Sequence, residues 1–339
     1  MFEVDRFVIA QGASGACSRM LVNVAEFALR RMAFLPLAVA VIGIISLNLA
    51  THAVHACNDN GGTPAPVVHF RPGMDLGVHV FTDANFTRRF KTPVDVESYV
   101  LKFFKSVFLR FRATHESLNL RLVNITVLND TSVETDCFDY HDHKYKPLRN
   151  WVTIKYLHLD KSLDKFKKCT KNNRSAVYLE EEVPLIYVLT GHDTAKDVNG
   201  ALKRYTGASQ AQGGICTDYN VAIGRDDGRS YLGVLTAVRE LGHLMGSKYD
   251  GWRLDNNKYV TDCHQASRHI MSYYENSQSS HTFSTCSKLE MEAALRNYTC
   301  KRSTSDVNLI NSSIQYPGEG MSRDVQCKKY MTNYTTVGK

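Results

Sequence analysis

The sequence lacks a concentration of charge of either sign. Its formal net charge of +7 is modest for 339 residues, and its lysines and arginines are scattered instead of gathered in stripes. Nucleic-acid binding is therefore not expected, and only a mild attraction to anionic surfaces follows from the charge. Hydrophobic residues make up 43% of the chain and charged residues 22%. This balance excludes a disordered protein and predicts a globular one with a sizeable core.

Long apolar runs are almost absent. One run covers residues 34–50, and two arginines stand shortly before it. With small residues near Ala56 as a cleavage site, this pattern predicts a signal peptide over 32–56 and a secreted, extracellular protein. A retained run of about 17 residues would be only a marginal membrane anchor, because spans need roughly 17–25. We expect cleavage near Ala56 and no stable membrane span.

The rest of the chain divides by composition. Residues 1–31 are an extension or result from a mis-assigned start. Residues 303–339 are rich in Ser, Asn and Thr with one cysteine, so we expect a tail without a core of its own. Between these ends we expect a short linker at 57–74 and one domain at 75–302.

Cysteines, in contrast, are plentiful. Nine are present, and removal of residues 1–56 leaves eight: Cys57, Cys137, Cys169, Cys216, Cys263, Cys286, Cys300 and Cys327. An even set in a secreted chain indicates disulfides, although spacing leaves their connectivity open. Sequons of the N-x-S/T type fit a glycosylated extracellular surface; there are seven, at Asn85, Asn124, Asn129, Asn173, Asn297, Asn311 and Asn333.

Strand-like and helix-like patterns alternate along the central part of the chain. Apolar runs and alternations predict strands at 75–82, 119–128, 152–157, 183–190 and 216–223. Helical spacing predicts helices at 93–113, in the Lys-rich segment 145–171 and at 230–246. Strands that alternate with helices predict an α/β fold.

The most informative window reads VRELGHLMGSKYD. Residues four apart on a helix share a face and can point two side chains at one metal ion. In the spacing H-E-x-x-H-x-x-G-x-x-H, a glycine then lets the chain leave the helix and return a third ligand. Here Arg239 stands at the first ligand position, His243 at the second and Tyr249 at the third. Glu240 takes the general-base position, and Gly246 takes the turn.

Two substituted ligand positions argue against a functional zinc site. The guanidinium of Arg239 is cationic at any relevant pH and has no lone pair to donate. A phenolate of Tyr249 could bind metal, but the ordinary pKa of tyrosine is about 10. Structural zinc binds with roughly 10–16 kcal/mol, so losing two of four ligands costs on the order of 6 kcal/mol, a factor of about 10⁴ in affinity. We expect no cofactor, with His243 as the only retained ligand position.

Four further segments are distinctive: LTGHD at 189–193, GGIC at 213–216, HIMSY at 269–273 and CSK at 286–288. Together with the window above they resemble the reprolysin (adamalysin) metalloproteases, and more particularly the reprolysin-like proteases of tick saliva. The resemblance implies a zincin/metzincin-like sandwich with a mostly parallel twisted sheet and an active-site helix. It also implies a lower lobe with a Met-turn, in which Met271 forms the floor of the site.

The resemblance further implies a disulfide between Cys216 and Cys300. We pair the other cysteines around it as Cys263 with Cys286 across the Met-turn, Cys137 with Cys169, and Cys57 with Cys327.

Other polar side chains have a structural interpretation. Without partner ligands, His243 is expected to be packed or hydrogen-bonded, and Glu240 to pair with Arg239 or to be held by backbone donors. Asp250 is expected to anchor local hydrogen bonds. The cluster in the 139–143 segment is expected to lie in a solvated polar loop: Asp139, His141, Asp142 and His143.

Two histidines near the Met-turn remain open candidates. His264 and His269 flank the turn, and one of them could approach the vacated metal position. Nothing in the sequence fixes their geometry.

Three functions are compatible with these residues. The first is a secreted, zinc-free and catalytically inactive protease homologue that binds extracellular host proteins of haemostasis, the matrix or immunity. The alternative is an active zinc metalloendopeptidase that cleaves such proteins, with Glu240 as the base. The third is a structural relic or decoy without a preferred ligand. The substituted ligands favour the first.

Overall fold

The computed structural model describes residues 74–114, 118–128, 131–145, 152–172, 185–251, 263–273, 281–297, 307–322 and 325. All of them belong to one compact unit, Pro66–Lys339. Several predictions lie outside the described residues, namely the signal peptide, most of the linker, Cys57, Cys300 and Cys327. Within the described part, no helix is long and apolar enough to cross a membrane.

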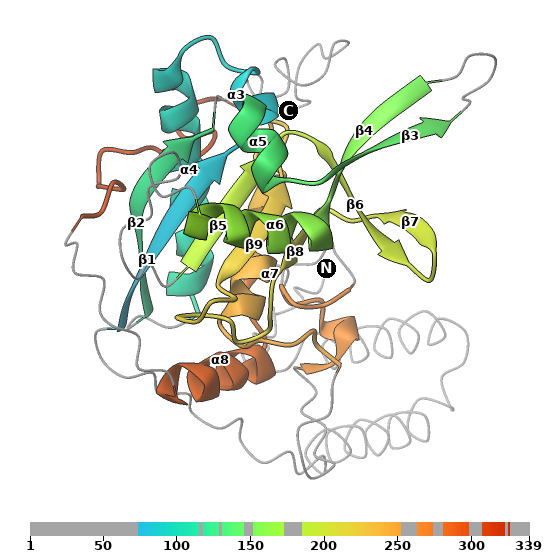
Figure 1. The fold of residues 1–339 in the computed structure, drawn as a ribbon. Coiled ribbons are helices and arrows are strands. Elements are labelled where there is room, and N and C mark those ends of the chain that lie inside the picture. The colour runs from blue at the N-terminus through green and yellow to red at the C-terminus, as the bar shows by residue number, and fades with distance from the viewer. Residues whose placement is uncertain are drawn as a thin grey trace, which may run out of the picture. The chain divides into compact units, whose positions relative to one another are not determined.

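The main sheet has five strands in the order β2-β1-β5-β9-β8 (Figure 1). The strands are β1 (Met74–Thr82), β2 (Leu118–Val127), β5 (Leu185–Thr190), β8 (Gly207–Ser209) and β9 (Val221–Arg225). All neighbouring pairs are parallel except β8 with β9, which is antiparallel. The predicted α/β fold with a mostly parallel sheet is therefore present, with an antiparallel strand at one edge.

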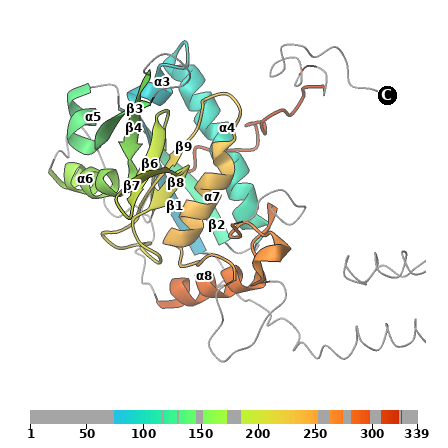
Figure 2. The same cartoon turned by 90° about the vertical axis from the view of Figure 1, so that its right-hand side faces the viewer.

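Helices cover both faces of this sheet (Figure 2). The helices α4 (Pro93–Arg112) and α7 (Gly233–Leu244) lie on one face, whereas α5 (Thr131–Cys137) and α6 (Leu159–Asn172) lie on the other. Successive residues of β5 alternate between the two cores. Leu185, Tyr187 and Leu189 join the core under α4 and α7, and Ile186 and Val188 join the core under α6. Because side chains of a strand alternate in direction, a continuous apolar strand is buried on both faces.

Local sequence explains where α4 begins. Thr92 accepts a hydrogen bond from the backbone of Asp95, and Asp95 caps Thr92 in return, with Pro93 as the first helical residue. This capping box and proline are typical of a helix start. The buried side follows the helical repeat with Val96, Val100 and Phe103, among others, so it packs against the sheet.

A second sheet has four strands in the order β3-β4-β6-β7. They are β3 (Tyr140–Tyr145), β4 (Val152–His158), β6 (Asp193–Val198) and β7 (Ala201–Arg204). β3 and β4 form a hairpin that extends away from the main sheet in Figure 1. The 139–143 segment was expected to be a polar loop, and that prediction is wrong, because His141, Asp142 and His143 lie in β3. Backbone pairing with β4 makes a strand of this polar sequence.

Two element boundaries also differ from the prediction. The strand expected at 216–223 begins at Val221. Gly213 and Cys216 both have positive φ, of 71° and 59°, so the chain turns through this region before it can extend. The helix expected at 230–246 is shorter, at Gly233–Leu244, and is followed by α8 (Thr285–Asn297) and the short 3₁₀ helix η2 (Gln265–Ser267) in the lower part of Figure 1.

Two of the predicted disulfides are present in the structure. Cys137 is bonded to Cys169, which ties α5 to α6, and Cys263 is bonded to Cys286, which ties the Met-turn region to α8. Cys216 is also disulfide-bonded. The other described cysteines are already paired, so its partner lies outside the described residues, as does the expected Cys300.

Residues 307–322, which belong to the predicted tail, are described and contact the domain. The backbone N–H of Leu309 donates to the carbonyl of Leu122 on β2 at 2.9 Å. Leu309 and Ile310 pack against the core under α4 and α7, and Lys105 of α4 donates to the carbonyl of Ile314. This part of the segment therefore covers the β2 edge of the main sheet, where unpaired backbone groups would otherwise be open.

Candidate functional site

Helix α7 carries the candidate site and is fixed at its N-terminus by a buried carboxylate. Asp226, directly after β9, accepts hydrogen bonds from the backbone N–H groups of Gly233 and Gly228 and from the hydroxyl of Tyr99. These bonds satisfy donors that a helix start leaves open. Ala237, Val238, Leu241 and Leu244 are fully buried on the sheet side, so the opposite face of α7 presents the residues of the motif.

Gly246 turns the chain out of the helix, as its place in the motif predicts. Its φ is 104°, a conformation that favours glycine. A Cβ at this position would lie 2.5 Å from the Cβ of Ala294 on α8. The turn brings Tyr249 back to His243, with ring centroids 4.5 Å apart in an edge-to-face arrangement. The second and third ligand positions of the motif are therefore neighbours.

His243 is held in one orientation. Its Nδ1 lies 2.8 Å from the backbone carbonyl oxygen of Ser247. A carbonyl can only accept, so Nδ1 carries the proton and Nε2 carries the lone pair. Nε2 is buried without a hydrogen-bond partner among the described residues. Burial lowers the pKa of His243, so the imidazole is neutral at neutral pH. The expectation of a packed, hydrogen-bonded histidine agrees with this geometry.

Tyr249 is a poor substitute for a histidine ligand. Its ring stacks on Tyr273 with centroids 4.5 Å apart, besides its contact with His243. Burial raises its pKa to about 12, and the nearby carboxyl of Glu240 acts in the same direction. The phenol is therefore protonated at neutral pH, and its oxygen is not available as a phenolate.

Arg239 joins the helix to the Met-turn. Its Nε donates to the backbone carbonyl of Ile270 at 2.6 Å, and its Nη2 donates to the carbonyl of Ser272 at 2.7 Å. Met271 lies between these two residues and is fully buried. Its sulfur is 3.4 Å from where a Cβ of Gly242 would be, so it lies directly against α7 as the floor that the resemblance implied. We call these contacts of Arg239 the Arg239 staple.

Glu240 does not pair with Arg239, and that expectation is wrong. Arg239 Nε and Nη2 donate to backbone carbonyls, whereas the side chain of Ser209 on β8 lies near the Glu240 carboxyl and favours its charged form. Only 7% of Glu240 is exposed. Burial raises its pKa to about 7, although the Ser209 hydrogen bond and the charges of Lys196 and Arg239 oppose the shift. The base position of the motif thus holds a buried acid whose pKa is shifted toward neutral pH.

The turn after the helix is anchored by Asp250, as predicted. Its carboxyl Oδ1 accepts hydrogen bonds from Ser284 at 2.6 Å and Ser287 at 3.3 Å, and its backbone N–H donates to the carbonyl of Met271 at 3.0 Å. These bonds connect the Met-turn to α8. Asp250 therefore has a structural role.

Neither flanking histidine replaces a missing ligand. His264 caps η2 by accepting from the backbone N–H of Ala266 at 3.1 Å. The Nδ1 of His269 lies 3.2 Å from the hydroxyl of Thr282. In the part of the chain that the structure describes, no three His, Cys, Asp or Glu side chains form a group that could hold a metal ion.

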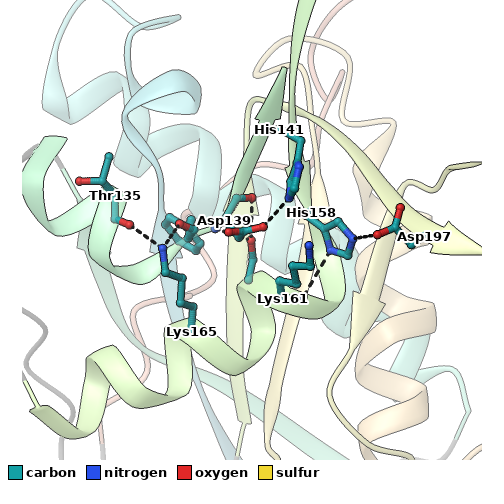
Figure 3. Close-up of polar contacts among 9 residues, drawn as sticks. Thr135, Asp139, His141, His158, Lys161, Lys165 and Asp197 are labelled. Atoms are coloured by element: carbon teal, nitrogen blue, oxygen red, sulfur yellow. Dashed lines mark hydrogen bonds and ion pairs between the residues drawn. The ribbon is translucent and has the colours of Figure 1, made fainter. Parts of the chain in front are cut away.

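A second polar cluster lies at the base of the β3–β4 hairpin (Figure 3). His141 contacts Asp139 at 2.7 Å, and His158 contacts Asp197 at 3.1 Å. The two imidazoles point at different carboxylates, with ring centroids 5.3 Å apart. The Nδ1 of His158 also accepts from the backbone N–H of Lys161 at 3.4 Å, in the first turn of α6. These pairs connect the second sheet to α6. Sequence reasoning missed His158, because the only signal for it was its position directly before a helix.

The chemistry of the three ligand positions does not fit a zinc ion. Arg239 has no lone pair and donates to carbonyls, and Tyr249 keeps its proton. Only His243 offers a free lone pair at Nε2.

Residues 156–302 match the model of the Reprolysin (M12B) family zinc metalloprotease. This segment is reprolysin-like. It contains α7, the Met-turn and α8, together with all three ligand positions. No curated protein matches the chain in sequence.

Two solved structures are similar to the chain at a low level. One is metalloproteinase-II from Bacteroides fragilis, with 14% identity and a TM-score of 0.38 over 68% of this chain and 55% of that chain. The other is archaemetzincin (amzA) from Methanopyrus kandleri, with 15% identity and a TM-score of 0.35 over 66% of this chain and 96% of that chain. The chain thus spans about half the length of the first of these proteins.

Proposed function

We propose that this protein is a secreted, reprolysin-like domain that binds extracellular host proteins and does not cleave them. The Arg239 staple is the observation that carries the proposal. It replaces the first metal ligand by a cation that donates to the carbonyls of Ile270 and Ser272. The helix and the Met-turn are thereby connected through protein contacts, which supports a site whose shape does not depend on an ion.

Tyrosines around the site support a binding role. Tyr273 is 60% exposed and Tyr205 is 43% exposed. Tyr249 stacks on Tyr273, and Tyr205 is close enough to influence the pKa of Tyr249. Tyrosine supplies large contact area and a hydrogen-bonding tip, and it is enriched in the residues that dominate protein interfaces. We call Tyr205, Tyr249 and Tyr273 the tyrosine surface.

Elemental analysis for zinc tests the loss of the metal. The secreted, disulfide-bonded protein is dialysed exhaustively and compared with the double variant Arg239→His, Tyr249→His. We expect no stoichiometric zinc in the unmodified protein and bound zinc in the double variant. One zinc per chain in the unmodified protein would refute the zinc-free reading.

Partner binding is tested on the tyrosine surface. Tyr273→Ala and Tyr205→Ala should each weaken capture of host plasma or matrix proteins, because they remove exposed aromatic area beside the site. The control is Tyr219→Ala, which removes a tyrosine that is 58% exposed outside this surface. Equal capture by all four proteins would rule out the tyrosine surface as the binding site.

The second candidate is an active endopeptidase, and the state of Glu240 favours it. A buried carboxyl with a pKa of about 7 is suited to general acid-base chemistry at neutral pH. Cleavage of casein or fibrinogen by the unmodified protein, lost in Glu240→Gln, would support this candidate. Absence of cleavage together with absence of zinc would leave the binding function.

A further inference from the structure

The segment that covers β2 contains a sequon with a particular geometry. Asn311 lies in a turn closed by the hydrogen bond from the backbone N–H of Ile314 to its carbonyl at 3.3 Å. The side-chain Oδ1 of Asn311 accepts from the backbone N–H of Ser313 at 2.9 Å and from the Ser313 hydroxyl at 2.5 Å. Asn311, Ser312 and Ser313 are all exposed. The sequon hydroxyl therefore points at the carboxamide of its own asparagine.

The sequon of Asn124 lacks this arrangement. Asn124 lies within β2, paired with β1 at His79, and is only partly exposed. The hydroxyl of its sequon residue, Thr126, is hydrogen-bonded to the Nε2 of His79 at 2.8 Å. An extended strand also separates the hydroxyl from the carboxamide two residues before it.

Asn85 lacks it as well. It lies in the short helix α3 (Ala84–Thr87), and the hydroxyl of Thr87 donates to the carbonyl of Asp83 at 2.9 Å. The backbone of Asn85 is packed closely on Gly191, where an added Cβ would lie 2.7 Å from the carbonyl carbon of Asn85. Asn85 itself is only partly exposed, whereas Asn311 is exposed.

We propose that Asn311 carries an N-linked glycan, in preference to Asn85 and Asn124. In the transfer, the Nδ2 of Asn311 attacks the anomeric carbon of an oligosaccharide held on a lipid diphosphate. The new C–N bond forms as the C–O bond to the diphosphate breaks, the lipid diphosphate leaves with the electron pair, and one Nδ2 proton passes to a base of the transferase. A hydroxyl that donates to Oδ1 draws electron density toward the oxygen and makes the Nδ2 protons more acidic.

The location of Asn311 also suits a large modification. The segment is fixed by Leu309 and Lys105 to β2 and α4, whereas Ser209 of β8 contacts Glu240 at the candidate site. β2 and β8 are the two edges of the main sheet. Four strand spacings, about 19 Å, separate them. A glycan at Asn311 therefore shields the β2 edge and leaves the tyrosine surface open.

Site-resolved mass spectrometry tests the proposal. The full chain, with its own N-terminal residues, is expressed in animal cells and collected from the medium and the cells. Peptides are treated with the amidase that converts a glycosylated asparagine to aspartate, in water labelled with heavy oxygen. We expect label on Asn311 in most chains and on Asn85 and Asn124 in few.

Variants assign the label to the Asn311 sequon. Asn311→Gln and Ser313→Ala should each abolish the label at this site, and Ser312→Ala should keep it, because Ser312 contributes no sequon hydroxyl. An unmodified Asn311 in the wild-type chain would overturn the proposal, whether or not other sites are occupied. Equal occupancy at Asn85 or Asn124 would overturn the preference.

Discussion

The guanidinium of Arg239 donates a hydrogen bond of 2.7 Å to the backbone carbonyl of Ser272, thirty-three residues later in the chain. Ser272 is fully buried, so its carbonyl is shielded from solvent and is hydrogen-bonded within the protein. The Arg239 cation thus contributes to the structure of the turn that contains Met271.

Arg239→Ala should lower stability. The variant removes charge-assisted hydrogen bonds to the carbonyls of Ile270 and Ser272, each worth roughly 1.5–3 kcal/mol. Because Arg239 is only partly buried, we expect a loss of about 2–4 kcal/mol in the free energy of unfolding. This corresponds to a decrease in Tm of roughly 5–15 °C for a domain of this size.

Thermal unfolding of matched variants measures the effect. Arg112→Ala, exposed in the last turn of α4, removes the same charge without a staple and should change Tm by only a degree or so. Arg239→Lys should fall between wild type and Arg239→Ala, since an ammonium cannot reproduce the two-carbonyl geometry. A Tm for Arg239→Ala equal to that of Arg112→Ala would contradict the staple.

Glu240→Gln should stabilise the protein at high pH. The folded-state pKa of Glu240 is raised from 4.5 to about 7, chiefly by burial. The folded protein therefore binds the proton more tightly than the unfolded chain, and this contribution is complete below 4.5 and is lost as pH rises through about 7. The difference corresponds to roughly 3 kcal/mol at most.

Denaturation curves at two pH values resolve this effect. At about pH 8, Glu240→Gln should be more stable than wild type, and at about pH 4 the two should nearly coincide. Glu97→Gln, exposed on α4, is the control and should follow wild type at both values. A gain for Glu240→Gln that does not depend on pH would point to packing and not to ionisation.

Sequence reasoning identified four of the five strands of the main sheet, together with α4 and α7, because these elements carry strong signals, but it missed the three-residue strand β8. Val96, Val100 and Phe103 repeat with the helical period, and Leu185 to Leu189 form a continuous apolar run. The strands β6 and β7 were missed because their short sequences, DTAKDV and ALKR, carry several charged residues and no apolar run. Their pairing comes from backbone contacts with β4 and with each other.

The candidate site was predictable only in part. The motif gave the positions of Glu240, His243 and Gly246, since they are local to one helix and its turn. The Arg239 staple binds backbone carbonyls, which every residue has, so no side-chain pattern in the sequence predicts these hydrogen bonds. The contact of Ser209 with Glu240 likewise depends on how β8 lies beside α7.

His79 should make the protein sensitive to acid. It is fully buried on β1, and burial lowers its pKa from 6.5 to about 3. Between pH 6.5 and about pH 3, the unfolded chain therefore binds a proton at His79 and the folded protein does not. Stability from this group is present above 6.5 and is lost as pH falls, by about 1.4 kcal/mol for each pH unit.

Comparison with His79→Phe tests this. Phenylalanine retains the ring that stacks on Phe81 but cannot be protonated, so the variant should lose less stability between about pH 6.5 and pH 4.5. His143→Phe, exposed on β3, should retain the wild-type slope. Parallel pH profiles for wild type and His79→Phe would exclude His79 as the source of acid sensitivity.

Gly246→Ala should be strongly destabilising, for two separable reasons. An alanine at a φ of 104° is strained, and its Cβ would lie 2.5 Å from the Cβ of Ala294. We expect a loss of about 2–4 kcal/mol from strain and overpacking together. Gly242→Ala is the milder comparison, because it keeps a helical conformation and its Cβ would meet Phe283 at 3.1 Å and Met271 at 3.4 Å.

The variant Ala294→Gly separates the two contributions to the destabilisation by Gly246→Ala, namely the clash with α8 and the backbone strain. Removing the Ala294 methyl relieves the clash but leaves the backbone strain, and by itself it costs about 1 kcal/mol in helix α8. The double-mutant cycle should therefore show a favourable coupling of about 1 kcal/mol or more between the two sites. If the two effects simply add, contact with α8 does not limit the turn, and the requirement for glycine at 246 arises from its backbone conformation alone.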